Sequence, residues 1–263
     1  MLGAIIGDII GSLYEFESDK TKDFELFTQD NRPTDDSMMT IAVGLACVNA
    51  STEDERAFKQ ALKNNMRRIG REYPDADYGG MFYNWLMDDH AYPYESIGNG
   101  SAMRVSPCGW VMDTLEGTEK LARWSAEVTH DSPEGIRGAQ SVAAAIFLAR
   151  NGASKEEIRE YIEDKYYDLD FTVDGIRDSY SFDVTCEGSV PQAIVCFLDG
   201  EDYEDTVRNA VSLGGDGDTI SAIAGSIAEA FYGIPDEIAE QGLSYLDENL
   251  LEYYYEYSGE IYG

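Results

Sequence analysis

Apolar residues recur along this chain mostly at the three- and four-residue spacing of helices that bury one face. Residues 2–14 are almost wholly apolar, and Gly3, Gly7 and Gly11 recur in them at every fourth position. Small residues at that spacing form a strip along one face of a helix. We therefore expect a second helix to pack closely against this strip, in the neighbourhood of Asp8.

Other segments combine a helix start signal with apolar residues at helical spacing. The polar residues 51–54 precede Phe58, Leu62 and Met66, and Ser154 to Glu157 forms a capping box, which starts a helix. Further helices are predicted over residues 119–128, 133–151, 190–198, 201–211, 220–232 and from 235 onward.

The rest of the chain has weaker periodicity. We expect loops and a short helix over residues 73–94, irregular structure over 168–188, and a Tyr-rich tail over 253–262 that packs across the surface. No strand pattern of any length competes with the helices, so the fold class predicted is all-α. No linker-like stretch divides the chain, which predicts a single domain over residues 1–263.

Two stretches place paired aspartates and a hydroxyl residue at the start of an apolar helix. They are Thr34-Asp35-Asp36-Ser37 and Asp216-Gly217-Asp218-Thr219, and in the second Thr219 is the expected N-cap. Each alone fits an ordinary helix start, where Asp and Thr are common. Together they offer only oxygen ligands, which suit magnesium, calcium or manganese rather than zinc. Paired carboxylates beside an apolar wall are also costly unless a cation compensates them.

Charge and cysteine content narrow the choice of partner and compartment. The chain has 19 Lys and Arg against 51 Asp and Glu, a formal net charge of −32, which makes nucleic acid or an anionic membrane surface an unfavourable partner. The N-terminal stretch has no basic residues and meets Asp8 early, so we expect neither a signal peptide nor a membrane span. The four cysteines show no paired spacing, which predicts reduced thiols in a cytoplasmic protein.

Three further features are ambiguous when taken singly. Gly98-Asn99-Gly100-Ser101 is either a plain turn or a loop that presents backbone N–H groups to a phosphate, with Arg104 close by. His130 at a helix end is more often a structural hydrogen-bonding group than a catalytic one. Glu15 alone would be interpreted as a solvated helix terminus.

In combination these stretches resemble the ADP-ribosylglycohydrolase family. The resemblance rests on motifs that follow the family's order over residues 3–233 and so cover nearly the whole chain. They are Gly7-Asp8-Ile9-Ile10-Gly11 with Tyr14-Glu15-Phe16, Thr34-Asp35-Asp36-Ser37, Gly98-Asn99-Gly100-Ser101-Ala102-Met103-Arg104, Thr129-His130, and Gly214-Gly215-Asp216-Gly217-Asp218-Thr219.

The resemblance implies an all-α fold with two magnesium ions, or manganese as a substitute, in a central cleft. The metal ligands it implies are Thr34, Asp35, Asp36, Asp216, Asp218 and Thr219. Gly98, Asn99, Gly100 and Ser101 would line the diphosphate, and His130 would lie beside the ribose. Glu15 and Asp35 would act in catalysis, whereas Asp8 would support the ligands rather than join them. Residues 73–95 give no clear match to the family pattern.

The function implied is magnesium-dependent hydrolysis of the glycosidic bond between ADP-ribose and an acceptor, with release of ADP-ribose. The partner would be an ADP-ribosylated protein or a small-molecule ADP-ribose conjugate. Two alternatives stay open at this point. One is a catalytically inactive ADP-ribose-binding or structural relative, and the other is a two-metal phosphohydrolase, which would release AMP and ribose 5-phosphate. The sequence leaves the acceptor and the oligomeric state open.

Overall fold

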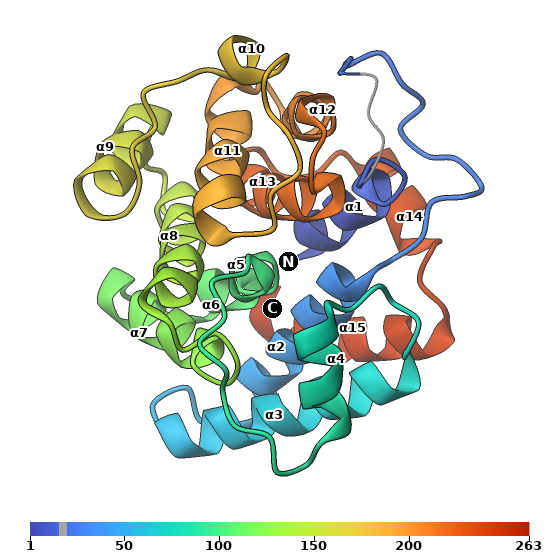
Figure 1. Cartoon of the computed structure of the whole chain (residues 1–263), viewed down its shortest axis with the longest axis vertical. Helices are drawn as coiled ribbons and strands as arrows, with labels where there is room; N and C mark the ends of the chain where they lie inside the picture. The colour runs from blue at the N-terminus through green and yellow to red at the C-terminus, as the bar shows by residue number, and fades with distance from the viewer. Residues whose placement is uncertain (16–19, 263) are drawn as a thin grey trace.

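The computed structural model describes residues 1–15 and 20–262, without the side chain of Tyr262. In this part the chain is all-α, as predicted, and its only β-type pairing is an isolated bridge between Gly98 and Thr185 (Figure 1). Phe16, part of the first family-like motif, lies outside the described residues. The helices are α1 (Leu2–Gly11), α2 (Asp35–Asn49), α3 (Glu55–Glu72), α4 (Gly80–Met87), α5 (Gly100–Met103), α6 (Ser106–Val111), α7 (Leu115–Ala126), α8 (Pro133–Arg150), α9 (Lys155–Lys165), α10 (Val173–Ile176), α11 (Cys186–Asp199), α12 (Tyr203–Leu213), α13 (Gly217–Tyr232), α14 (Asp236–Leu243) and α15 (Glu248–Tyr262).

Helices α1 and α13 pack against each other so closely that the contact positions of α1 have no room for a side chain (Figure 1). A Cβ atom added to a glycine of α1 would overlap a backbone carbonyl oxygen of α13, with Gly3 facing Gly225, Gly7 facing Ser221 and Gly11 facing Gly217. Each step of four residues along α1 matches a step of four along α13 in the opposite direction. The glycine strip therefore fixes the register of two antiparallel helices, and the predicted close approach is confirmed.

The remaining helices surround this pair and share one hydrophobic cluster with it. Phe58, Leu62 and Met66 are fully buried on α3, as their spacing predicted. The capping box at Ser154 is present, with both reciprocal hydrogen bonds formed. All four cysteines are buried free thiols. No helix in the described part of the chain has both the length and the apolar character needed to span a membrane.

The structure corrects two sequence-based expectations. Helix α13 begins earlier than predicted, with Asp216 at the N-cap, because the Ile220 N–H already donates to the Asp216 carbonyl at 2.9 Å. Thr219 therefore lies inside the first turn and is not the N-cap. The Tyr-rich tail is part of a helix, α15, and Tyr257 on it is fully buried against Gly44 of α2.

Candidate functional site

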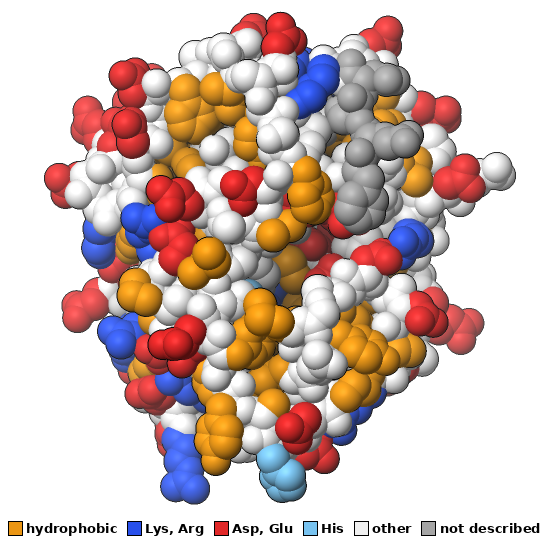
Figure 2. Space-filling view, in the orientation of Figure 1, with side chains coloured by type: hydrophobic (Ala, Val, Ile, Leu, Met, Phe, Trp, Pro, Cys, Tyr) orange, Lys and Arg blue, Asp and Glu red, His pale blue; other side chains and the backbone are white. Residues whose placement is uncertain are grey.

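A cavity of about 510 Å³ lies among the loop after α1 and the starts of α2, α4, α5 and α13. Figure 2 shows this face hollowed near its centre, with acidic side chains visible at depth and hydrophobic side chains around the opening. Six carboxylates line the cavity, from Glu15, Asp35, Asp36, Asp77, Asp216 and Asp218. The two aspartate clusters of the sequence, far apart along the chain, thus meet in one space.

Asp8 binds the start of α2 from the neighbouring helix α1. Its carboxylate accepts hydrogen bonds from Thr34 N at 2.9 Å, Thr34 Oγ1 at 2.6 Å and Ser37 N at 3.1 Å, and also from the Ser37 hydroxyl. Thr34 occupies the N-cap position but makes no side-chain cap bond of its own. Asp8 therefore satisfies the orphan donors of α2 in its place. This position agrees with the supporting role that the sequence suggested for Asp8.

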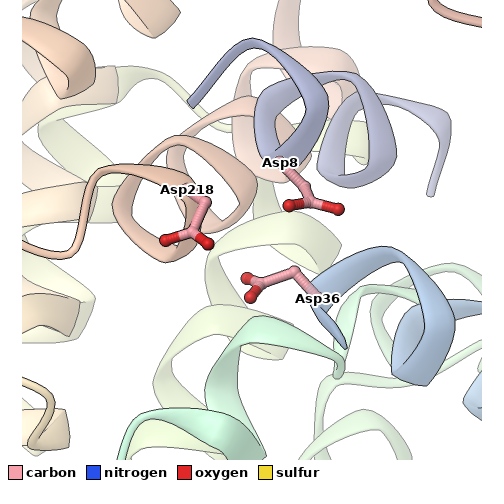
Figure 3. Close-up of side chains that lie close together, drawn as sticks. All are labelled: Asp8, Asp36 and Asp218. Atoms are coloured by element: carbon pink, nitrogen blue, oxygen red, sulfur yellow. The ribbon is translucent and has the colours of Figure 1, made fainter. Parts of the chain in front are cut away.

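Asp36 is buried, and one of its oxygens has no partner among the described residues. Its Oδ2 accepts a hydrogen bond from Thr219 Oγ1 at 3.1 Å, whereas Oδ1 is buried without one. A buried carboxylate oxygen is expensive to leave unsatisfied. In Figure 3 the carboxylates of Asp36, Asp8 and Asp218 point toward one another from α2, α1 and α13. The free oxygen thus lies where several carboxylates could share a cation.

Asp216 and Asp218 at the start of α13 complete the acidic wall. Asp216 Oδ2 accepts from Asn99 Nδ2 at 2.6 Å, and Asp218 Oδ1 accepts from Thr219 N at 2.9 Å. Thr34 Oγ1 lies 3.5 Å from Asp218 Oδ2, so the two predicted ligand stretches touch. The ends of two helices and one loop residue hold these side chains in place.

Burial and mutual repulsion raise the pKa values of the acidic cluster. Burial, followed by the charge of Asp218, raises the pKa of Asp8 to about 7. The same two causes raise the pKa values of Asp35, Asp36 and Asp216 well above their ordinary range, and burial raises that of Asp218. Without a compensating cation these groups cannot all be ionised near neutral pH. The repulsion within the cluster therefore does not stabilise the fold, and a bound cation would relieve it.

Two overlapping groups of oxygens are close enough to hold cations. One consists of Asp8, Asp36 and Asp218, and the other of Glu15, Asp216 and Asp218, with the ligand atoms of each group within 4.8 Å of one another. Asp218 belongs to both, so two ions bound there would share it. The donors are all oxygen, which fits magnesium or manganese. The hydroxyls of Thr34 and Thr219 border the same oxygens. The two groups include Asp36, Asp216 and Asp218 of the predicted ligand set, but they contain Asp8 and Glu15 and lack Asp35.

Glu15 is half-buried at the mouth of this cluster. Burial, then the charges of Asp218 and Asp77, raise its pKa to about 7. The interpretation of Glu15 as a solvated helix terminus does not fit this environment, since α1 ends at Gly11 and Glu15 lies in the cavity wall.

The glycine loop forms a second wall that adjoins the acidic one, because Asn99 donates to Asp216 at 2.6 Å. Gly98, Asn99 and Gly100 line the cavity, and a Cβ atom on Gly100 would lie 3.1 Å from the His130 Nε2. Backbone can approach a ligand there with no side chain between them. Ser101 differs, because it is fully buried and its hydroxyl donates to the Gly135 carbonyl at 2.7 Å. Its side chain supports the loop, so any contact of Ser101 with a ligand would have to come from its backbone.

His130 presents one ring nitrogen to the cavity. Its Nδ1 lies 2.7 Å from Thr129 Oγ1, and its Nε2 is on the side of the glycine loop. Burial and the charge of Arg104 hold the pKa of His130 well below its usual value, so the imidazole is neutral. Arg104 also lines the cavity, but its guanidinium donates to Ser125 O at 3.0 Å and Thr129 Oγ1 at 2.8 Å. Arg104 therefore serves mainly to position Thr129 and His130 rather than to bind a ligand through its charge.

Residues 77–82, where sequence reasoning found no match, supply the third wall. Asp77 has a φ of 64° and lines the cavity, as do Met81 and Phe82 from the start of α4. Val184 lies in the lining as well. The Gly79-Gly80 pair at the start of α4 signals a turn, but an added Cβ atom at either glycine would meet nothing within 4 Å, so the pair does not mark a close approach. The apolar character of the wall could be found only from the fold.

A family model for ADP-ribosylglycohydrolases matches residues 1–258. Among curated proteins, the chain is 29% identical to human "ADP-ribosylhydrolase ARH3", with 91% of this chain and 86% of that protein covered. It is 27% identical to "ADP-ribosylarginine hydrolase Tri1" of Pseudomonas putida strain GB-1, with 89% and 70% covered. A solved structure described as an "ADP-ribosylglycohydrolase-related protein complex" shares the fold, with a TM-score of 0.62 over 93% of this chain and 95% of that one at 22% identity.

Proposed function

This chain belongs to the ADP-ribosylglycohydrolase family, and from that premise we propose that it is a magnesium-dependent enzyme that releases ADP-ribose from an acceptor. The chain is a glycohydrolase of the ADP-ribosyl class. The proposal adds the two cations, with manganese as a possible substitute, and the assignment of residues to roles. It also takes residues 1–263 as one domain, because one hydrophobic cluster draws on helices from α1 to α15.

The observation that carries the cation proposal is the buried, unpartnered Oδ1 of Asp36 among carboxylates with raised pKa values. The six acidic side chains that line the cavity and Asp8 beside them carry seven negative charges when all are ionised. Two magnesium ions would offset four of these charges, and the pKa values of about 7 for Asp8 and Glu15 leave part of the cluster protonated near neutral pH. Bound cations would therefore reduce the repulsion that the cluster exerts on a diphosphate.

The residues around the cavity suit cleavage at an anomeric carbon. Bound cations would orient the ribose hydroxyls and activate water, which is the chemistry that two-metal sites supply. Gly100 offers a backbone N–H group for the diphosphate, whereas the Gly98 N–H already donates to Ser96 Oγ at 3.1 Å. The neutral His130 offers Nε2 to a sugar hydroxyl. Glu15, with its raised pKa, would accept the proton from the attacking water as general base. The transition state has oxocarbenium character, so nearby carboxylates such as Asp35 favour it electrostatically.

Product analysis tests the proposal. The full chain is incubated with a panel of arginine-, serine- and small-molecule-linked ADP-ribose, with magnesium and with excess chelator. We expect free ADP-ribose from at least one conjugate, and at least a hundredfold less with chelator. AMP with ribose 5-phosphate would instead favour the phosphohydrolase alternative. Binding without turnover of any conjugate would favour an inactive relative. Activity that is undiminished in chelator would contradict the cation site while leaving the glycohydrolase assignment intact.

The acceptor would leave past the wall formed by Met81, Phe82 and Val184. This wall is apolar and carries no cationic side chain. It therefore offers no charge complement to an acidic acceptor, whereas Asp77 at its edge would favour a neutral or positively charged one. The conjugate that is cleaved fastest in the panel shows whether the preferred acceptor is acidic, neutral or positively charged.

A further inference from the structure

Helix α3 differs in charge from the rest of the molecule. It carries six of the chain's 19 Lys and Arg but only two of its 51 Asp and Glu. Residues 60–71 of this helix and the loop after α4 line a second, open cavity of about 440 Å³. Its lining consists of Gln60, Asn64, Arg67, Arg68, Arg71 and Asp89, none of which lines the cavity described above.

Aromatic rings hold two of these arginines in place. The Arg67 guanidinium carbon lies 4.5 Å from the centre of the Trp85 ring, and that of Arg68 lies 4.6 Å from the centre of the Tyr253 ring. Stacking on an aromatic face fixes the plane of a guanidinium group and leaves its edge free to donate. Because these contacts already restrict both side chains, binding of a ligand would cost less side-chain entropy.

The donors in this cavity are only partly used. Arg67 Nη2 donates to the Asp88 carbonyl at 2.8 Å, but Arg67 Nε is buried without a partner among the described residues. Neither Arg67 nor Arg68 forms an ion pair in the described part of the chain, whereas Arg71 is paired with Asp89 at 2.6 Å. The carboxylates of Asp88 and Asp89 lie near Arg67, and the side chain of Asp89 is 68% exposed. Three guanidinium groups against these two carboxylates leave a local excess of positive charge.

We propose that this cavity, formed by Arg67, Arg68 and Arg71 of α3, binds a small diphosphate-bearing anion outside the active site. Guanidinium edges match phosphate oxygens in pairs, and the carboxamides of Gln60 and Asn64 add neutral donors. A concave site of this size suits a small molecule better than a flat protein surface. The net charge of −32 does not prevent binding, because charges farther away than about 8 Å are screened at physiological salt.

Calorimetric titration with inorganic pyrophosphate tests the proposal on the full chain. Divalent cations are left out, because they would bind pyrophosphate themselves. The test variant is Arg68→Gln, since Arg68 is exposed and its loss should not impair folding. The matched control is Arg56→Gln, which removes the same charge from an exposed position of the same helix outside the cavity. We expect wild type and Arg56→Gln to bind alike, and Arg68→Gln to bind at least tenfold more weakly.

A second variant, Arg67→Lys, keeps the charge and loses the paired donors, and it too should bind more weakly. Circular dichroism melting of each variant checks that the fold is retained. The proposal is overturned if wild type does not bind pyrophosphate, if Arg68→Gln binds as well as wild type, or if Arg56→Gln loses as much affinity as Arg68→Gln. Binding of a Glu-rich peptide in place of pyrophosphate would equally overturn it, in favour of a protein-docking surface. Because the titration needs no catalysis, its outcome is independent of the proposed function.

Discussion

Two buried aspartates of the site have opposite hydrogen-bonding environments. Asp8 has donors on both oxygens, whereas Asp36 has one oxygen with none among the described residues. Satisfied carboxylates stabilise a fold, and unsatisfied ones are retained at a cost. We therefore assign Asp8 to the structure of the site and Asp36 to the binding of a cation.

Asp36→Asn separates these two roles. The change removes a negative charge that a cation needs, so magnesium-dependent turnover should fall by about a hundredfold or more. The metal-free protein should melt no lower than wild type, because the change also relieves repulsion with Asp218. Turnover and melting temperature of the purified variant check both statements. Asp164→Asn, an exposed change on α9, is the control and should leave both unchanged. Wild-type turnover at limiting magnesium would contradict the assignment.

Glu15→Gln tests the proposed general base. Base assistance is worth about a hundred- to ten-thousandfold in rate, so turnover should fall at least a hundredfold. Affinity for ADP-ribose should change little, because the glycine loop and His130 make the contacts proposed for it. Steady-state kinetics and calorimetry on one preparation measure both quantities. Glu160→Gln on α9 removes an exposed acid and should be neutral. Normal turnover in Glu15→Gln would leave activation of water to the cations alone.

At the scale of helices, the elements that could be predicted are those that local sequence signals determine. The starts of α2, α3, α8 and α9 follow capping residues and Pro133, and all four helices are present. The close packing of α1 was predictable for the same reason, because small residues at every fourth position reveal a strip even when its partner is unknown.

Non-local contacts account for what the sequence could not predict. Thr34 stands at the N-cap of α2 without a side-chain cap bond, and a carboxylate from another helix, Asp8, accepts from the N–H groups of Thr34 and Ser37. The helical Tyr-rich segment is stabilised by burial of Tyr257 against Gly44, a contact between distant parts of the chain. The wall that contains Asp77 and Phe82 has no periodicity that would place it in the cavity. These features depend on tertiary packing, which overrides local propensity.

Gly7→Ala tests the interlock of α1 with α13. A methyl group would overlap the Ser221 carbonyl, and backbone cannot move aside as a flexible side chain could. Overpacking of this kind costs about 1–3 kcal/mol, so the melting temperature should fall by several degrees. Gly259→Ala in α15 is the matched control, because nothing lies within 4 Å of its added methyl group. It should be neutral or stabilising, since Ala favours helix by about 1 kcal/mol. Equal melting of the two variants would contradict the steric account.

At the scale of the whole molecule, the acidic cavity links stability to pH. Raised pKa values mean that the folded protein holds more protons than the unfolded chain between pH of about 4 and 7. Stability from these groups is therefore complete at low pH and is lost as the pH rises through about 7. Bound magnesium should reverse that loss, because it replaces the protons.

Calorimetry in chelator and in magnesium, at pH 5 and pH 8, measures this linkage. In chelator the melting temperature should be lower at pH 8 than at pH 5, and magnesium should raise it more at pH 8. At a hundred times the dissociation constant a ligand stabilises by about 2.7 kcal/mol. Asp36→Asn should reduce both effects, which separates the site from the general repulsion of a chain with charge −32. A magnesium effect that is larger at pH 5 would contradict the argument.

The interlock of α1 with α13 also has a consequence for the order of events on the ribosome. Contacts that join the N-terminal part of the chain to α13 link residues far apart, such as Thr34 with Asp218, 184 positions away, and Gly3 with Glu229, 226 positions away. Synthesis at about 5–20 residues per second delivers α1 many seconds before α13. In that interval the glycine strip of the apolar α1 lacks α13, although α2 is already available to α1, and the strip is a candidate for chaperone binding. The metal site would then be completed late in folding, so an unfinished chain should not capture cations.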